Sequence, residues 1–154
     1  MRKKAIFSLI IAVSLIFVVF GGCFAETMSE GIKVVPEKET IYANEEGMWM
    51  YTLKLSSDTE GPVTVNSYVS KYFTMNGKYG THSTADEEQL KEWGVHKLYP
   101  NKTKTFRGGF PSKNDIYFED YIFIGTDKAG NEVMGAARVH FVKPERDKGV
   151  GPFD

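Results

Sequence analysis

The chain has 154 residues, 42% of them hydrophobic, and its 19 basic and 20 acidic residues leave a net charge of −1. This length supports one domain with a sizeable core. The charge balance argues against nucleic-acid binding, which needs a concentrated basic face. Cys23 is the only cysteine, so a domain that begins after it contains no internal disulfide and depends on burial for its stability.

The first 25 residues have the pattern of an export signal. Arg2, Lys3 and Lys4 give a basic start, a charge-free apolar run covers 5–20, and small residues come before the end at Ala25. This order is typical of a secretory signal. We therefore predict that residues 1–25 are a signal peptide and that the protein is periplasmic or secreted. Without its three basic residues, the exported part has 16 basic and 20 acidic residues.

The end of this signal has three interpretations. Cleavage after Ala25 would release a soluble domain. The sequence Phe20-Gly21-Gly22-Cys23 resembles a bacterial lipobox, in which Cys23 is lipidated and becomes the first residue of a membrane-tethered lipoprotein. The third interpretation is an uncleaved anchor, because the uncharged run of 21 residues over 5–25 is barely long enough to span a bilayer. Membrane contact is expected only through the lipid at Cys23 or through this anchor.

Alternating apolar and polar residues predict antiparallel strands in the first half of the exported part. A strand begins at Ile32, and Pro36 interrupts it as in an edge strand. Two further strands are expected over 48–55 and 63–69. Their inward-facing residues are predicted to be Trp49, Tyr51, Leu53, Leu55, Val63, Val65 and Val69.

A short helix is predicted over 83–94, after a turn at Asn76-Gly77. Thr84 would cap this helix, with Glu87 three residues later completing a capping box. Leu90 and Trp93 would share the face that packs onto the sheet.

Three more strands are predicted over 102–106, 117–126 and 133–142. Gly108 and Gly109 are expected to end the first of them. A turn over 127–131, with Asp at its start and Gly three residues later, joins the other two. The sandwich domain is therefore assigned to 26–144, and the polar residues 145–154 to a loose C-terminal tail.

The stretch from Tyr121 to Asn131, with Thr-Asp followed by Lys-Ala-Gly-Asn, resembles the last hairpin of bacterial immunoglobulin-like domains. The resemblance implies an all-β fold: an immunoglobulin-like two-sheet antiparallel sandwich of about seven strands with one short helix insertion. It also implies a tyrosine corner in the penultimate strand, at Tyr121 or Tyr117. Because such sandwiches serve many roles, the resemblance indicates little about function.

No motif in the sequence carries catalytic chemistry: a nucleophile elbow, a zinc helix and a Gly-rich phosphate loop are all missing. The three histidines, His82, His96 and His140, lack the spacing of metal ligands. Glu119 and Asp120 before a strand, and Asp127 and Asn131 around a turn, offer oxygen ligands for calcium, but turn chemistry already accounts for the second pair. We predict no enzyme, no metal and no cofactor.

The aromatic residues are the best indication of function. Exposed rings among polar residues supply affinity at protein interfaces and sugar-binding faces. The candidate binding residues lie in the middle of the chain: Tyr68, Tyr79, Trp93 and Tyr99. The alternative is that Trp93, Phe73 and Tyr72 only seat the insertion on the sheet.

These observations predict a non-catalytic binding or assembly module of the bacterial cell envelope. Its partner would be another envelope protein, contacted through loops or a sheet edge. The alternative is a carbohydrate-binding module, in which the aromatics of 68–99 stack on the sugar rings of a polysaccharide.

Overall fold

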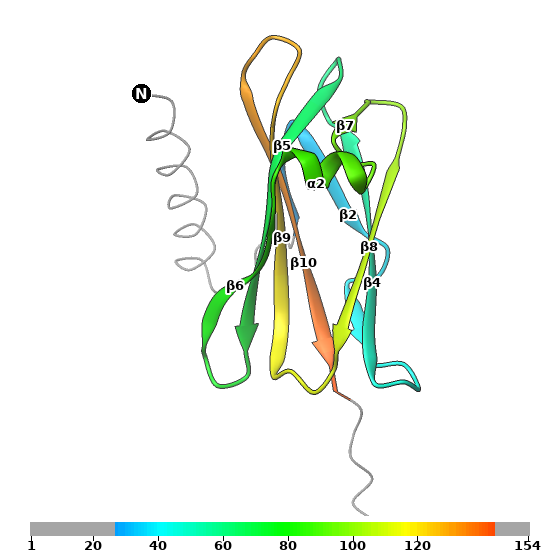
Figure 1. Cartoon of the computed structure of the whole chain (residues 1–154), viewed down its shortest axis with the longest axis vertical. Helices are drawn as coiled ribbons and strands as arrows, with labels where there is room; N and C mark the ends of the chain where they lie inside the picture. Colours follow the sequence, from blue (N-terminus) through cyan, green and yellow to red (C-terminus); the bar gives the residue numbers. More distant parts are fainter. Residues whose placement is uncertain (1–26, 144–154) are drawn as a thin grey trace, which may run out of the picture.

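The computed structural model describes residues 27–143, which form two facing β-sheets with one short helix at one end (Figure 1). The all-β prediction is confirmed. These residues contain ten strands, more than the predicted seven, because β1, β3 and β7 are short additions of two to four residues. The predicted signal, Cys23 and the predicted tail lie outside the described residues.

The larger sheet consists of β1 (Thr27–Glu30), β3 (Thr40–Tyr42), β5 (Val63–Thr74), β6 (Tyr79–Ala85), β7 (Lys97–Leu98), β9 (Ile116–Thr126) and β10 (Glu132–Val142). Its order is β1-β10-β9-β5-β6, with β3 beside β10 and β7 beside β5. All pairs are antiparallel except β3 with β10, which is parallel. The turn predicted over 127–131 joins β9 to β10, and its Asp127 side chain accepts hydrogen bonds from two backbone N–H groups of the turn.

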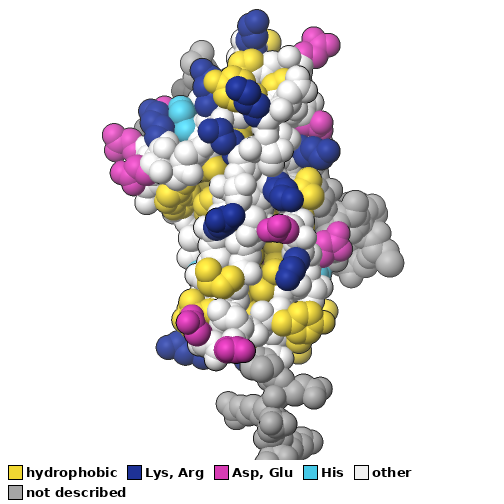
Figure 2. Space-filling model, turned by 90° about the vertical axis from the view of Figure 1, so that its right-hand side faces the viewer, with side chains coloured by type: hydrophobic (Ala, Val, Ile, Leu, Met, Phe, Trp, Pro, Cys, Tyr) yellow, Lys and Arg dark blue, Asp and Glu magenta, His cyan; other side chains and the backbone are white. Residues whose placement is uncertain are grey.

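The smaller sheet consists of β2 (Ile32–Pro36), β4 (Met48–Ser57) and β8 (Lys104–Pro111), in the order β2-β4-β8. β2 is an edge strand, as Pro36 predicted. The chain passes from the larger to the smaller sheet at Gly31, whose φ of 97° lies in the left-handed region that glycine adopts without strain. Figure 2 shows the side of the molecule where this sheet lies, with basic and acidic side chains spread among hydrophobic ones.

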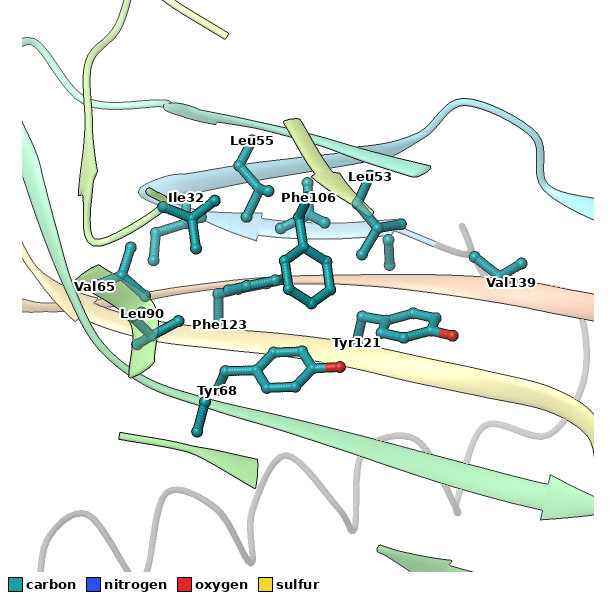
Figure 3. Packing of buried hydrophobic residues seen from close by; sticks show 14 of the residues in the cluster. Ile32, Leu53, Leu55, Val65, Tyr68, Leu90, Phe106, Tyr121, Phe123 and Val139 are labelled. Atoms are coloured by element: carbon teal, nitrogen blue, oxygen red, sulfur yellow. The ribbon is translucent and has the colours of Figure 1, made fainter. Parts of the chain in front are cut away.

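The core fills the space between the sheets (Figure 3). The alternation in β4 is confirmed, since Trp49, Leu53 and Leu55 are fully buried. The Trp49 indole N–H donates a hydrogen bond of 2.9 Å to the Val142 carbonyl. This bond ties the smaller sheet to the end of β10.

Val69 was predicted to face inward, and that prediction is wrong. The register between β5 and β9 shifts between Val65 and Ser67, so one extra residue changes which side chains face the core. Tyr68 is therefore buried inside, at 3% exposure. Val69 packs instead against the cluster that includes Ile122 on the outer face of the larger sheet.

Gly108 and Gly109 do not end a strand, contrary to the prediction, because β8 continues to Pro111. Their missing side chains leave room for residues of the neighbouring strand β4. A Cβ atom at Gly108 would overlap the hydroxyl group of Tyr51, and one at Gly109 would overlap the sulfur of Met50. Glycine in a strand often marks such a close approach.

The helix, α2, is shorter than predicted and covers Glu87–Glu92. Its N-cap is Asp86 rather than Thr84: the Asp86 carboxylate accepts a hydrogen bond of 3.0 Å from the Gln89 backbone N–H. Thr84 is unavailable because β6 stays paired with β5 through Ala85. Leu90 is fully buried as expected.

The close approach of β2 to β10 gives a first prediction. A Cβ atom at Gly135 would overlap the Ile32 carbonyl oxygen and lie 2.8 Å from its carbon. Gly135→Ala should therefore lower the free energy of unfolding by about 1–3 kcal/mol or more, as overpacking does.

The matched control is Gly61→Ala, where the new methyl group would meet only Lys128 carbons at 3.5 Å. This variant should stay within about 0.5 kcal/mol of the unsubstituted protein. Urea denaturation measures both, and equal stability of the two variants would show that the sheets do not approach as described.

Candidate functional site

A groove opens between the free edges of the two sheets. β6 ends the larger sheet on this side, and within residues 27–143 β8 pairs only with β4. The groove has a volume of about 450 Å³ and is lined by Tyr51, Tyr68, His82, Ser83, Trp93, Thr105, Phe106, Arg107, Gly108, Gly109 and Phe110. The helix α2 lies at one end of this opening (Figure 1).

Three aromatic rings form the wall near α2. Tyr68 comes from β5, Trp93 caps the C-terminal end of α2, and Phe106 comes from β8. Their ring centroids lie 5.9 Å apart for Tyr68 and Trp93, and 5.4 Å apart for each of the other two pairs. Trp93 remains 41% exposed, so this wall presents an aromatic surface at the mouth of the groove.

The other end of the groove is polar. The Glu119 carboxylate, on β9, is 1% exposed, and both of its oxygens lie 3.0 Å from Nδ1 of His82 on β6. The His82 side chain is 32% exposed. It stands perpendicular to the Phe110 ring, with centroids 4.9 Å apart. His82 lines the groove and Glu119 does not, so the imidazole lies between the groove and the buried carboxylate.

A β-bulge places His82 in the groove. Ser83 pairs with Ser70 but Thr81 pairs with Lys71, so His82 is an extra residue in β6. Bulges re-aim side chains in this way, and they are common beside functional sites. Because of this bulge, the neighbouring residues His82 and Ser83 both line the groove.

Hydroxyl groups continue the polar end into the core. The Ser83 hydroxyl lies 2.8 Å from that of Ser70 and donates to the Tyr68 hydroxyl at 3.5 Å. The Tyr51 ring packs against that of Tyr121, with ring centroids 4.5 Å apart and the planes tilted by 40°. The Tyr121 hydroxyl is buried and makes no hydrogen bond of acceptable geometry with any residue that the structure describes. Tyr68 and Tyr121 point their hydroxyl groups the same way in Figure 3.

Burial and hydrogen bonding set the charge of this cluster. Burial raises the pKa of Tyr51, Tyr68 and Tyr121, so these hydroxyls stay neutral. The hydrogen bond to Glu119 raises the pKa of His82 above its usual value of 6.5. When His82 is protonated, it forms an ion pair with Glu119 that is surrounded by neutral hydroxyl groups.

Only two of the four predicted binding residues meet in this groove, namely Tyr68 and Trp93. Tyr79 and Tyr99 are not part of its lining. Tyr79 has the Lys71 ammonium 5.9 Å from its ring centroid, and Tyr99 has the ammonium of Lys102 at 5.8 Å. The four aromatics do not form one continuous face.

The predicted tyrosine corner is absent at Tyr121, whose hydroxyl has no backbone partner in the described part of the chain. Tyr117 is 45% exposed and packs against the His140 ring. The placement of Glu119 and Asp120 before a strand is also wrong, since both lie inside β9. They point to opposite faces, and Asp120 forms a bidentate pair with Arg138 at 2.7 and 2.9 Å.

The polar half of the groove was not predicted. His82 and Tyr51 were not named as binding residues, and Glu119 was considered only as an oxygen ligand for calcium. The alternation of side chains along β9 could have predicted that Glu119 points inward, since it shares its face of the strand with the buried Tyr121 and Phe123. A carboxylate at an inward position of an apolar strand needs a partner. Nothing in the sequence pattern indicated the bulge that supplies His82.

Among residues 27–143, no group of three or more His, Cys, Asp or Glu side chains is placed to hold a metal ion. In the same part of the chain, no helix is long and apolar enough to cross a bilayer.

The chain has only low similarity to known proteins. No family model matches the sequence, and no curated protein matches it. Among solved structures, a structural-genomics target called SoR45 has 13% identity and a TM-score of 0.42, with 84% of this chain and 92% of that chain covered. The ApaA protein from Bordetella pertussis has 13% identity and a TM-score of 0.47, with coverage of 78% and 95%.

A Niemann-Pick type C2 protein from the Japanese carpenter ant has 9% identity and a TM-score of 0.40, with coverage of 79% of this chain and 100% of that chain. These similarities are too low to indicate what this chain binds.

The ion pair in the groove predicts how stability depends on pH. The pKa of His82 is raised in the folded protein, so protonation of His82 stabilises the fold. This stabilisation is fully present at pH values below about 6.5, the pKa of histidine in the unfolded chain. This contribution should be lost as pH rises through the raised pKa. Urea denaturation between pH 5.5 and 9 should therefore show a falling free energy of unfolding.

In His82→Gln, the decline with pH should be smaller than in the unsubstituted protein. His96→Gln is the control, since His96 lies outside the groove lining and its Nδ1 lies 3.0 Å from the Val65 carbonyl oxygen. An unchanged pH profile in His82→Gln would refute the assignment.

Proposed function

We propose that this protein is exported and acts as a non-catalytic binding module of the bacterial cell envelope. We further propose that the groove between β6 and β8 binds a small organic ligand. The observation that carries the proposal is the combination in one groove of an aromatic wall and a partly exposed histidine that is paired with a buried carboxylate. Small-molecule sites are typically concave and lined by apolar and aromatic side chains with a few placed polar groups.

The size of the groove supports a ligand with one or two rings. Its volume of about 450 Å³ lies in the range of roughly 300–1,000 Å³ that is usual for small-molecule sites. Trp93, Phe106 and Tyr68 would contact the flat face of a ring, and the hydroxyl groups and His82 would bind its polar edge. Both an aromatic ring and a sugar ring fit this description.

The walls of the groove are fixed before any ligand arrives. Tyr51 lies across the backbone of Gly108, and Phe106 and Phe110 are at most 8% exposed. His82 is held by Glu119. A site that is already ordered loses little conformational entropy on binding.

The scaffold that we propose for this site is immunoglobulin-like. The order β2-β4-β8 facing β10-β9-β5-β6 supports this, because an immunoglobulin sandwich pairs its first, second and fifth strands in one sheet and its third, sixth and seventh in the other. In this assignment, β6 is the added strand beside the third, and α2 takes the place of the fourth strand. The smaller sheet then lacks one strand, and the groove lies where that strand would pair.

A second candidate function is binding of a protein partner by strand addition to β8. The observation that favours it is the edge position of β8, eight residues long, in the smaller sheet. An extended segment can add to such an edge through backbone hydrogen bonds.

The groove proposal is tested with one-ring probes: benzoate, benzamide, methyl glucoside and phenethylamine. We expect at least one of them to bind and to change the fluorescence of Trp93, because Trp49 is fully buried. Calorimetry should show that Trp93→Ala lowers the affinity for that probe by about 10-fold.

Tyr99→Ala is the matched control, since Tyr99 is 39% exposed and lies outside the groove lining. It should leave the affinity unchanged. If no probe binds, or if both variants weaken binding equally, the groove is not the ligand site.

Strand addition predicts a different result. With an envelope protein that crosslinks to this chain, amide hydrogen exchange should slow in β8 and remain unchanged in β2, the opposite edge of the same sheet. Protection confined to other strands would exclude this second function.

A further inference from the structure

The polar end of the groove indicates the chemical class of the ligand. Resting on the proposed function of the groove, we infer that the ligand is an organic anion, a ring that carries a carboxylate, and that His82 binds this carboxylate. The ring would lie against Trp93 and Phe106, and the carboxylate would accept a hydrogen bond from Nε2 of His82.

The orientation of His82 supports this assignment. Its Nδ1 is the nitrogen that faces Glu119, with both carboxylate oxygens at 3.0 Å. The carboxylate fixes the proton on Nδ1 and turns Nε2 away from it. No described residue bonds to Nε2, and the half-exposed ring lines the groove. When the ring is protonated, Nε2 carries an N–H that can donate to a bound ligand.

The charges around the groove favour an anion over a cation. Arg107 is the charged residue of the lining besides His82. Among residues 27–143, the one acidic group in contact with His82 is Glu119, which is 1% exposed and already paired. The other titratable groups around this end are Tyr51 on β4, Tyr68 and Tyr72 on β5, and Tyr121 on β9.

The hydroxyl groups add donors without adding charge. Tyr51, Tyr68 and Ser83 line the groove. Tyr51 and Tyr68 remain protonated at neutral pH because burial raises their pKa. A hydroxyl group beside an imidazolium can donate a second hydrogen bond to a carboxylate, and bonds to a charged group are the stronger kind.

A neutral sugar would make fewer of the possible contacts in this groove. Its hydroxyl groups could bond to Tyr51 and Ser83, but they carry no charge to match the protonated His82 and Arg107. The two ligand classes therefore differ in pH dependence. Binding of an anion should weaken as His82 loses its proton, whereas binding of a sugar should not.

The experiment compares benzoate with benzamide, which has the same shape without the charge. Titration calorimetry is done at pH 6 and pH 9, a range over which benzoate stays ionised. At pH 6, benzoate should bind at least about 10-fold more tightly than benzamide, which is the usual effect of a hydrogen bond to a charged group. At pH 9, most of this difference should be lost.

The variant His82→Gln leaves Glu119 buried without its partner and could fold poorly. The double variant His82→Gln with Glu119→Gln removes both charges and keeps a neutral pair that can hydrogen bond. In the double variant, benzoate and benzamide should bind equally at both pH values. The control His96→Gln should retain the full preference for benzoate at pH 6.

Each outcome has one meaning. A preference for benzoate that disappears at pH 9 and in the double variant supports the inference. Equal binding of benzoate and benzamide, or tighter binding of methyl glucoside or phenethylamine, overturns it while the groove remains a ligand site. If none of the four probes binds, the proposed function of the groove fails, and this inference fails with it.

Discussion

A carboxylate cannot be buried between two sheets without a partner, and Glu119 imposes this condition on one whole end of the sandwich. Its position in the sequence of β9 directs it inward, between the core residues of the same strand. The partner, His82, comes from an edge strand that needs a bulge to deliver it. The inward tyrosines then surround the pair with hydroxyl groups. The result is a core that is apolar near Leu53 and Leu55 and polar near β6.

The two sheets also differ in width, and this difference leaves the polar end accessible. The larger sheet extends to β6, whereas the smaller sheet stops at β8. The helix α2 covers part of the remaining opening with Trp93. His82 lines the groove, and its side chain is 32% exposed. The polar cluster is therefore accessible to solvent at the side where the sheets differ in width.

Regular alternation made much of this fold predictable, as in β4, where every second residue from Trp49 onward is inside. The predictions failed where one residue was added to a strand. The extra residue after Val65 turned Val69 to the outer face of the larger sheet, and the extra residue His82 created the polar end of the groove. A bulge depends on the register of the neighbouring strand, which no local pattern contains. The N-cap of α2 was predicted at Thr84 but lies at Asp86, because the pairing of β6 with β5 continues through Ala85.

The short strands at the start of the domain have a mechanical consequence. β1 and β3 lie end to end along β10, the first antiparallel to it and the second parallel. A force that pulls the two ends of the domain apart would peel β1 from β10 one hydrogen bond at a time. The same force would act on all the hydrogen bonds between β3 and β10 at once, because it would shear these two parallel strands past each other. A domain held by its N-terminal end would thus yield first at β1 and resist at β3, and single-molecule extension would register two separate force peaks.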